Sequence, residues 1–152
     1  MGVLGEFYNY DVSLVGDDSW QLIPHVKEAL ERLGEDAVTM LDDKTTYDAF
    51  HGTRWTAGSG RSRKRDNLRW KSCMQVDTVV VSGVMTNLCC ETTARSAFVH
   101  NYRVAFLSDG TATSDERHHK ATLDNIQFGF GRVMTCGEFR DLLEERGQAL
   151  MQ

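Results

Sequence analysis

Short apolar runs alternate along the chain with segments whose apolar residues recur at helical spacing. The runs are rich in β-branched residues and predict four strands: Ala37–Leu41, Val76–Ser82, Tyr102–Leu107 and Gly131–Thr135. The central run, Val79–Val81, has no polar residue within it. Such a run is typical of a strand that is buried on both faces.

Four helices are expected between and after these strands. The first follows Trp20, with Pro24 in its first turn and Gly34 after its end. The others are expected from about Cys89 to Phe98, from Glu116 to Phe128 and from Cys136 to Arg146. Strands that alternate with helices predict an α/β fold with βαβ units and a parallel sheet.

Ligands of such sheets bind at the carboxyl ends of the strands. Three segments are therefore expected near a binding site: Asp42–Lys44, Gly83–Cys89 and Ser108–Asp109. Each follows one of the predicted strands directly, so their side chains are expected to meet at one edge of the sheet.

Two segments do not fit the alternating pattern. Residues 1–13 form an irregular N-terminal segment, and the domain is expected over residues 14–152 with an atypical basic loop at 56–71. The basic cluster in this loop is a candidate nucleic-acid or localisation patch. A net charge of −5 favours a solvated loop and argues against a general nucleic-acid-binding protein.

The length of 152 residues fits one domain, and 41% hydrophobic and 26% charged residues are typical of a globular protein. No apolar run is long enough to span a membrane and no secretory signal is visible, so a cytoplasmic location is expected. The four cysteines lack zinc-ligand spacing and are expected to be free thiols. We therefore expect neither a metal nor a cofactor.

Cys89 stands where a predicted strand and a turn lead into a helix. A thiol there faces the positive end of the helix dipole and unpaired backbone N–H groups, which favour the reactive thiolate and can hold an oxyanion. Lys44 follows another strand at the same sheet edge, and its ammonium can support the thiolate and shuttle a proton. The residues alone leave open that Cys89 is an inert buried thiol and Lys44 a surface lysine.

Other assignments are open as well. The adjacent Cys89 and Cys90 could form a redox-reactive thiol site. His118 and His119 suggest a metal, but adjacent residues of a helix point in different directions, so packing and solvation are favoured.

The stretch Val79–Phe98 resembles the signature of the isochorismatase-like hydrolase superfamily, which includes isochorismatases, nicotinamidases, N-carbamoyl amidohydrolases and ureidoacrylate hydrolases. Gly83 leads to Cys89 six residues later, and Thr93-Ala94-Arg95 follows. Lys44–Thr53 is similar to the lysine motif of the superfamily. The resemblance runs from about Leu14 to Leu142 and implies a three-layer α/β/α, Rossmann-like fold.

This resemblance implies a cysteine hydrolase with a Cys-Lys-Asp triad, in which Cys89 is the nucleophile and Lys44 the lysine. It places the oxyanion hole at the backbone N–H groups of Met85 and Cys89, and a non-proline cis peptide between Val84 and Met85. Tyr47 and Phe50 are weaker candidates for the substrate pocket. The chain has no Asp-x-His metal motif of the nicotinamidase branch. The expected substrate is a small amide, ureide or vinyl ether, and a homo-oligomer is possible.

The chain departs from the family pattern at the aspartate. The family motif, two apolar residues followed by Asp-x-Gln near the N-terminus, is not found, and Asp11, Asp17 and Asp18 follow no strand pattern. We therefore expect an incomplete sheet that lacks the N-terminal strands. The alternative function is a truncated, catalytically impaired relative that acts as a non-enzymatic or interaction protein.

Overall fold

The computed structural model describes residues 22–34, 37–38, 41, 44–53 and 76–149. The chain divides into two units, residues 1–40 and 41–152, and each is described by itself. The irregular segment expected at 1–13 and the basic loop expected at 56–71 lie outside the described residues, as do Asp42, Asp43 and Cys73.

The first unit contains helix α2, Pro24–Leu33. Pro24 occupies its first turn, where the missing N–H has no intrahelical partner to lose. Arg32 lies in the last turn and pairs with Glu28 at 3.7 Å, and Gly34 ends the helix with a φ of 80°. Both ends therefore lie where proline and glycine predicted them.

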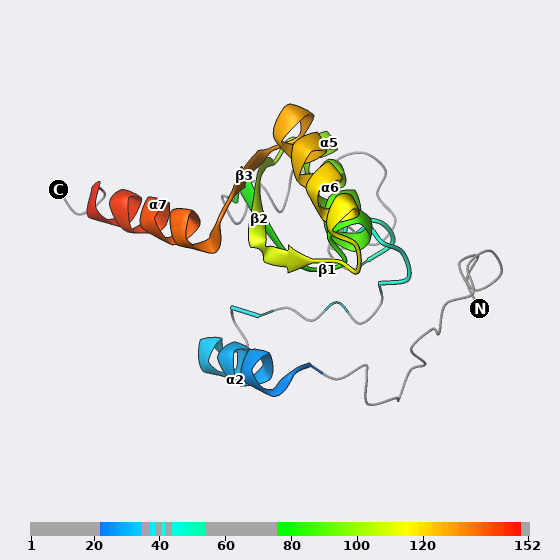
Figure 1. Cartoon of the computed structure of the whole chain (residues 1–152). Coiled ribbons are helices and arrows are strands. Elements are labelled where there is room, and N and C mark those ends of the chain that lie inside the picture. Colours follow the sequence, from blue (N-terminus) through cyan, green and yellow to red (C-terminus); the bar gives the residue numbers. More distant parts are fainter. Residues whose placement is uncertain (1–21, 35–36, 39–40, 42–43, 54–75, 150–152) are drawn as a thin grey trace. The chain divides into compact units, whose positions relative to one another are not determined.

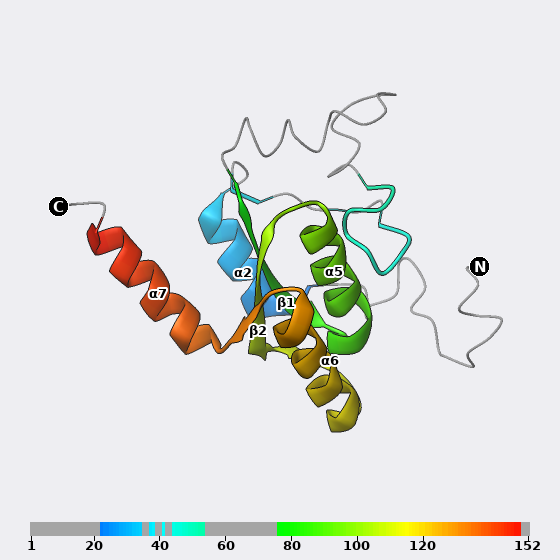
Figure 2. The ribbon, with the colours of Figure 1, turned by 90° about the horizontal axis from the view of Figure 1, so that it is seen from above.

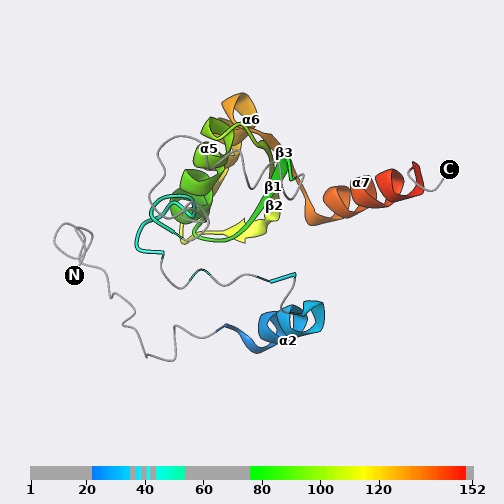
Figure 3. The same ribbon diagram turned by 180° about the vertical axis from the view of Figure 1, so that it is seen from behind.

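The second unit is built on a parallel sheet in the order β1-β2-β3, drawn from three viewpoints in Figures 1, 2 and 3. The strands are β1, Thr78–Val84; β2, Arg103–Ala112; and β3, Arg132–Met134. A π-helical turn, η2 (Thr86–Cys90), runs directly into α5, Glu91–Val99. Two further helices follow in this unit, α6 (Glu116–Gly129) and α7 (Cys136–Ala149). The predicted α/β architecture is confirmed.

Strand β2 is the strand that is buried on both faces. Val104 and Phe106 point into a core that α5 and α6 cover, with Ala94, Ala97 and Ile126 fully buried. Ala105 and Leu107 point to the opposite face, where Phe139 of α7 packs against them. Helices α5 and α6 lie over one face of the sheet (Figure 3), and on the other face β2 contacts the start of α7 through Phe139, in keeping with the expected three layers.

The expectation that Val79–Val81 is buried on both faces was wrong. Val79 and Val81 are 8% and 6% exposed, whereas Val80 is 41% exposed. The reason is the position of β1, which among the described residues pairs with β2 alone and forms an edge of the sheet. An uninterrupted apolar run does not distinguish an edge strand from a central one.

The strand expected at Ala37–Leu41 is not formed at its described residues. Ala37 lies in a turn, and Val38 and Leu41 lie outside helices and strands. A strand needs hydrogen bonds to a neighbouring strand, which an apolar run by itself does not supply.

Strand β2 continues through Ala112 rather than ending at Leu107, so Ser108 and Asp109 do not form a strand end. Asp109 instead accepts a hydrogen bond of 2.7 Å from the backbone N–H of Cys136 at the start of α7. This bond lowers the pKa of the Asp109 carboxyl. Asp109 therefore caps a helix, which also explains an acidic residue at this position.

The pairing of β1 with β2 shifts just before the turn to η2. Val81 pairs with Phe106 but Gly83 pairs with Thr111, so residues 107–110 of β2 lie opposite Ser82 alone. Gly83 has a φ of 113°, in the left-handed region that residues with a Cβ rarely adopt. Glycine therefore allows the chain to leave β1 and enter the turn.

We expect Gly83→Ala to lower the free energy of unfolding by about 1–2 kcal/mol, because alanine is strained at a positive φ. The matched control is Gly147→Ala in α7, where an added Cβ meets no other atom. This control should keep or raise stability by up to about 0.5 kcal/mol. The measurement is the denaturation midpoint in urea, and equal midpoints for the two variants would contradict the assignment.

Candidate active site

Cys89 lies in η2, at the start of the helical run that α5 continues. The peptide bond between Val84 and Met85 is cis, at the position expected from the resemblance. The Met85 carbonyl accepts hydrogen bonds from the backbone N–H groups of Leu88 and Cys90, at 3.1 and 3.2 Å. These bonds close the turn around Cys89, whose side chain is partly exposed.

Cys90 has a different environment from its neighbour. It is 4% exposed, belongs to the core, and its thiol donates to the Ser82 carbonyl at 3.9 Å. Burial raises the pKa of the Cys90 thiol to about 11; nearby Cys89 also raises this pKa, while the charge of Lys44 lowers it. Cys90 is therefore a neutral packing residue, and the exposed member of the pair is Cys89.

Two side-chain contacts hold the turn from outside. The Thr86 hydroxyl, fully buried, shares a hydrogen bond of 2.9 Å with Nδ1 of His119 in α6. Thr113, just beyond β2, donates to Oδ1 of Asn87 at 2.7 Å. The first contact fixes the turn to α6, and the second fixes it to the end of β2.

The segment that carries Lys44, residues 44–53, runs alongside α5 without regular secondary structure. The Ala49 N–H donates to the Thr93 hydroxyl at 3.1 Å, and that hydroxyl donates to the Tyr47 carbonyl at 3.3 Å. Asp48 accepts from Ser96 of α5 at 2.8 Å and from the Phe50 N–H at 2.8 Å. Side chains of α5 therefore fix a segment that has no strand to hold it.

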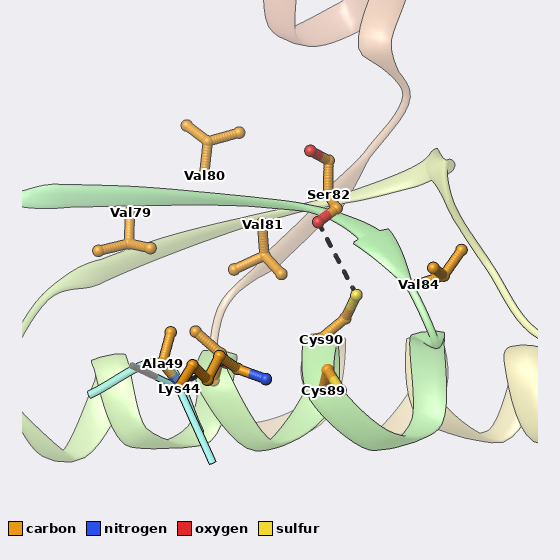
Figure 4. A pocket seen from close by; sticks show the side chains of 10 residues that line it. Lys44, Ala49, Val79, Val80, Val81, Ser82, Val84, Cys89 and Cys90 are labelled. Atoms are coloured by element: carbon orange, nitrogen blue, oxygen red, sulfur yellow. Dashed lines mark hydrogen bonds between the residues drawn. The ribbon is translucent and has the colours of Figure 1, made fainter. Parts of the chain in front are cut away.

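Lys44 and Cys89 line the same cavity, which has a volume of about 320 Å³. Figure 4 shows the Lys44 ammonium directed towards the two cysteines at the start of the helix. Its effect on the Cys90 thiol places its charge within electrostatic reach of the cysteine pair. The remaining wall comes from β1, from Ala49 and from Thr93.

Two of the weaker candidates lie elsewhere. Phe50 is 4% exposed and packs in the core, with its ring 5.2 Å from that of His100 and 5.8 Å from that of Tyr102. Neither Phe50 nor Tyr47 is among the residues that line this cavity. Phe50 therefore anchors the backbone of the segment that carries Lys44 rather than lining the cavity.

Asp48, Thr93 and Ser96 were not singled out from the sequence. Asp48 lies within the quoted lysine motif, and Thr93 and Ser96 lie within the quoted cysteine signature. The sequence pointed to these residues only in that each is a polar side chain within one of the two motifs expected to meet at the site. Only the structure shows which of them pair.

Within the described part of the chain, His118 and His119 belong to no cluster of potential metal ligands. His119 bonds to Thr86, and no group of three or more metal-ligating side chains occurs among the residues that the structure describes. The described lining of the cavity also contains no carboxylate. In the same residues, no helix has the length and apolar character that a membrane span needs.

The Thr93-Ala94-Arg95 triplet has three separate structural tasks. Thr93 holds the lysine segment, and Ala94 is fully buried against the sheet. Arg95 pairs with Glu91 at 2.6 Å and lies 4.0 Å from the centre of the Phe130 ring. Glu91 also accepts from Thr122 of α6 at 2.7 Å, so α5 contacts the lysine segment, the sheet and α6.

Comparison with known proteins shows which domain the sequence matches. The sequence matches the isochorismatase domain over residues 11–138. It is 41% identical over 139 residues to Nicotinamidase 3 of Arabidopsis thaliana, covering 91% of this chain and 62% of that protein. It is 30% identical over 121 residues to ureidoacrylate amidohydrolase RutB of Caulobacter vibrioides, covering 77% of this chain and 52% of that protein.

A solved structure shares the fold. The nicotinamidase SaPncA of Staphylococcus aureus superposes with a TM-score of 0.65 at 25% identity, over 80% of this chain and 69% of that one. The chain spans about half to two thirds of the length of the two relatives above. Because the domain match covers most of the sequence, the chain belongs to the isochorismatase family.

Proposed function

We propose that this chain is a cysteine hydrolase of small-molecule amides or related C–N and C–O bonds, with Cys89 as nucleophile and Lys44 as its proton-transfer partner. The observation that carries the proposal is the shared cavity of about 320 Å³, which brings Cys89 and Lys44 together from segments 45 positions apart. A cavity of this volume suits a small metabolite.

The first half of the reaction forms a thioester. The Cys89 thiolate attacks the carbonyl carbon, and the developing oxyanion is held by the backbone N–H groups of Met85 and Cys89 at the two ends of the turn. As the tetrahedral intermediate collapses, the Lys44 ammonium gives a proton to the leaving nitrogen. The amine departs, and Lys44 is left as a neutral amine.

The second half regenerates the site. Neutral Lys44 takes a proton from water as the water oxygen attacks the thioester carbonyl. Collapse of this intermediate releases the carboxylic acid and restores the Cys89 thiolate, and Lys44 is again an ammonium. Lys44 thus gives one proton in the first half and regains one in the second, so the cycle needs no further group. An aspartate of the kind that the family resemblance implies would take over the activation of water.

The names of the relatives guide the choice of substrates. One is a nicotinamidase and another a ureidoacrylate amidohydrolase, so amides and ureides are the first compounds to test. Isochorismate represents the vinyl ethers. The described lining is mostly apolar apart from Lys44, Ser82, Thr93 and the cysteines, which favours a planar substrate with one reactive polar group.

One observation favours a second candidate, the catalytically impaired relative. The described lining of the cavity has no carboxylate, and β1 exposes Val80 and Val84, 41% and 68%, at the edge of the sheet. A site with nucleophile and lysine but a slow water-activating step would form the thioester and release it poorly. Stoichiometric acylation without turnover would identify this candidate.

We expect alkylation to distinguish the two adjacent cysteines. With iodoacetamide at about pH 8, Cys89 should be modified and Cys90 spared, because burial both shields Cys90 and raises its pKa to about 11. Peptide mass spectrometry of the modified protein assigns the sites, and Cys90→Ala is the matched control that should leave the rate unchanged. Faster labelling of Cys90 than of Cys89 would overturn the assignment.

We expect Cys89→Ala to abolish hydrolysis of the active compound in a panel of nicotinamide, ureidoacrylate and isochorismate. Lys44→Ala should lower kcat by about 10²–10⁴-fold, the range for loss of a proton-transfer group. Cys90→Ala should keep kcat within about threefold, because the Cys90 thiol is buried in the core cluster and has no role in the proposed reaction. Product release is followed by chromatography, and full activity of Cys89→Ala would rule out the proposed nucleophile.

A further inference from the structure

We propose that Asp48, Thr93 and Ser96 form a clamp that sets the position of Lys44 relative to Cys89. These three are positioning residues, because their hydrogen bonds are with each other and with backbone groups of the lysine segment. The inference rests on the proposed pairing of Lys44 with Cys89 and adds the elements that control it.

The clamp has two parts, both formed between α5 and the segment 44–53. In the first, the Thr93 hydroxyl receives the Ala49 N–H at 3.1 Å and gives its own proton to the Tyr47 carbonyl at 3.3 Å. In the second, the two oxygens of Asp48 divide between Ser96, at 2.8 Å, and the Phe50 N–H, at 2.8 Å. Thr93 thus binds the backbone on both sides of Asp48, and Ser96 binds the Asp48 side chain.

The helical run of η2 and α5 sets the spacing of the groups in this arrangement. Cys89, Thr93 and Ser96 are separated by four and then three residues, the spacing that places side chains along one face of a helix. Lys44 lines the cavity with the cysteines, residues 47 and 49 bind Thr93, and Asp48, which lies between them in the sequence, binds Ser96. The proposed nucleophile in η2 and both attachment points in α5 therefore lie on one continuous helical run.

The segment needs this clamp because it lacks other regular support. It contains no helix or strand, so its backbone has no ladder of hydrogen bonds to fix it. Phe50 and Thr53 anchor its far end: Phe50 is buried, and the Thr53 hydroxyl donates to the Ala49 carbonyl at 2.6 Å. Asp48 and Thr93 are the attachments between that anchor and Lys44. A hydrogen bond to a charged carboxylate is among the stronger contacts available for the purpose.

The test is a double-mutant cycle read by the rate of Cys89 alkylation with iodoacetamide. Lys44→Ala should slow this rate about tenfold by removing the charge that favours the thiolate. Ser96→Ala and Asp48→Ala should each slow it about threefold or more, and neither should slow it further once Lys44 is alanine. Asp48→Asn keeps one acceptor oxygen and should give an intermediate rate, so it also serves if Asp48→Ala does not fold.

Two controls separate positioning from loss of structure. Arg95→Ala removes the pairing of Arg95 with Glu91, at 2.6 Å, on the same helix but touches no clamp contact. It should leave Cys89 alkylation near the wild-type rate. General loosening would instead expose thiols and speed labelling of the buried Cys90, whereas loss of the clamp should slow Cys89 and leave Cys90 protected.

Wild-type rates in Ser96→Ala and Asp48→Ala, or losses that add fully to that of Lys44→Ala, would overturn the clamp. An unchanged rate in Lys44→Ala would overturn it too, because there would be no pairing to position. Coupled alkylation losses in a protein that hydrolyses none of the test compounds would support the clamp and reject the proposed hydrolysis. The two proposals can therefore fail separately.

Discussion

The structure of the site depends on the continuous helical run that begins at Thr86 and continues through α5. Gly83 lets the chain leave β1, and the turn that follows places Cys89 at the helix start, where the dipole and backbone N–H groups favour negative charge. The same helix buries Ala94 and Ala97 against the sheet, so its axis is fixed by close packing. Every other group of the site is positioned against this helix.

The lysine segment shows how a reactive residue is placed without a strand. Lysine is long and flexible, with about 2 kcal/mol of rotamer entropy, so a loosely held backbone would spread its ammonium over many positions. Buried Phe50 and the hydrogen bonds to Thr93 and Ser96 hold the backbone of the lysine segment in place. The cavity then needs to order only the side chain.

The sequence predicted the local elements well and the tertiary relations unevenly. Helix α2 has Pro24 in its first turn, and α6 and α7 begin at Glu116 and Cys136, all as the sequence predicted, because caps and periodicity are local properties. The exposure of Val80 and the extension of β2 to Ala112 could not be read, because both depend on which elements lie beside a strand. The meeting of Lys44 and Cys89 was predicted from strand ends and resemblance, yet the described residues before Lys44 form no strand. Lys44 and Cys89 thus line one cavity although one of the strands used to bring them together is not formed at its described residues.

Cys89 and Cys90 differ in burial, and their adjacent positions in the sequence do not show which of the two is buried. Both thiols belong to the same turn, and only their direction differs: one lines the cavity while the other also enters the core beside Ser82. A buried thiol with a pKa of about 11 is a poor nucleophile and a good packing group. Cys89, by contrast, is only partly exposed but stays outside the core cluster that contains Cys90. The difference between the two thiols is therefore one of burial, which the packing of the helix against β1 sets.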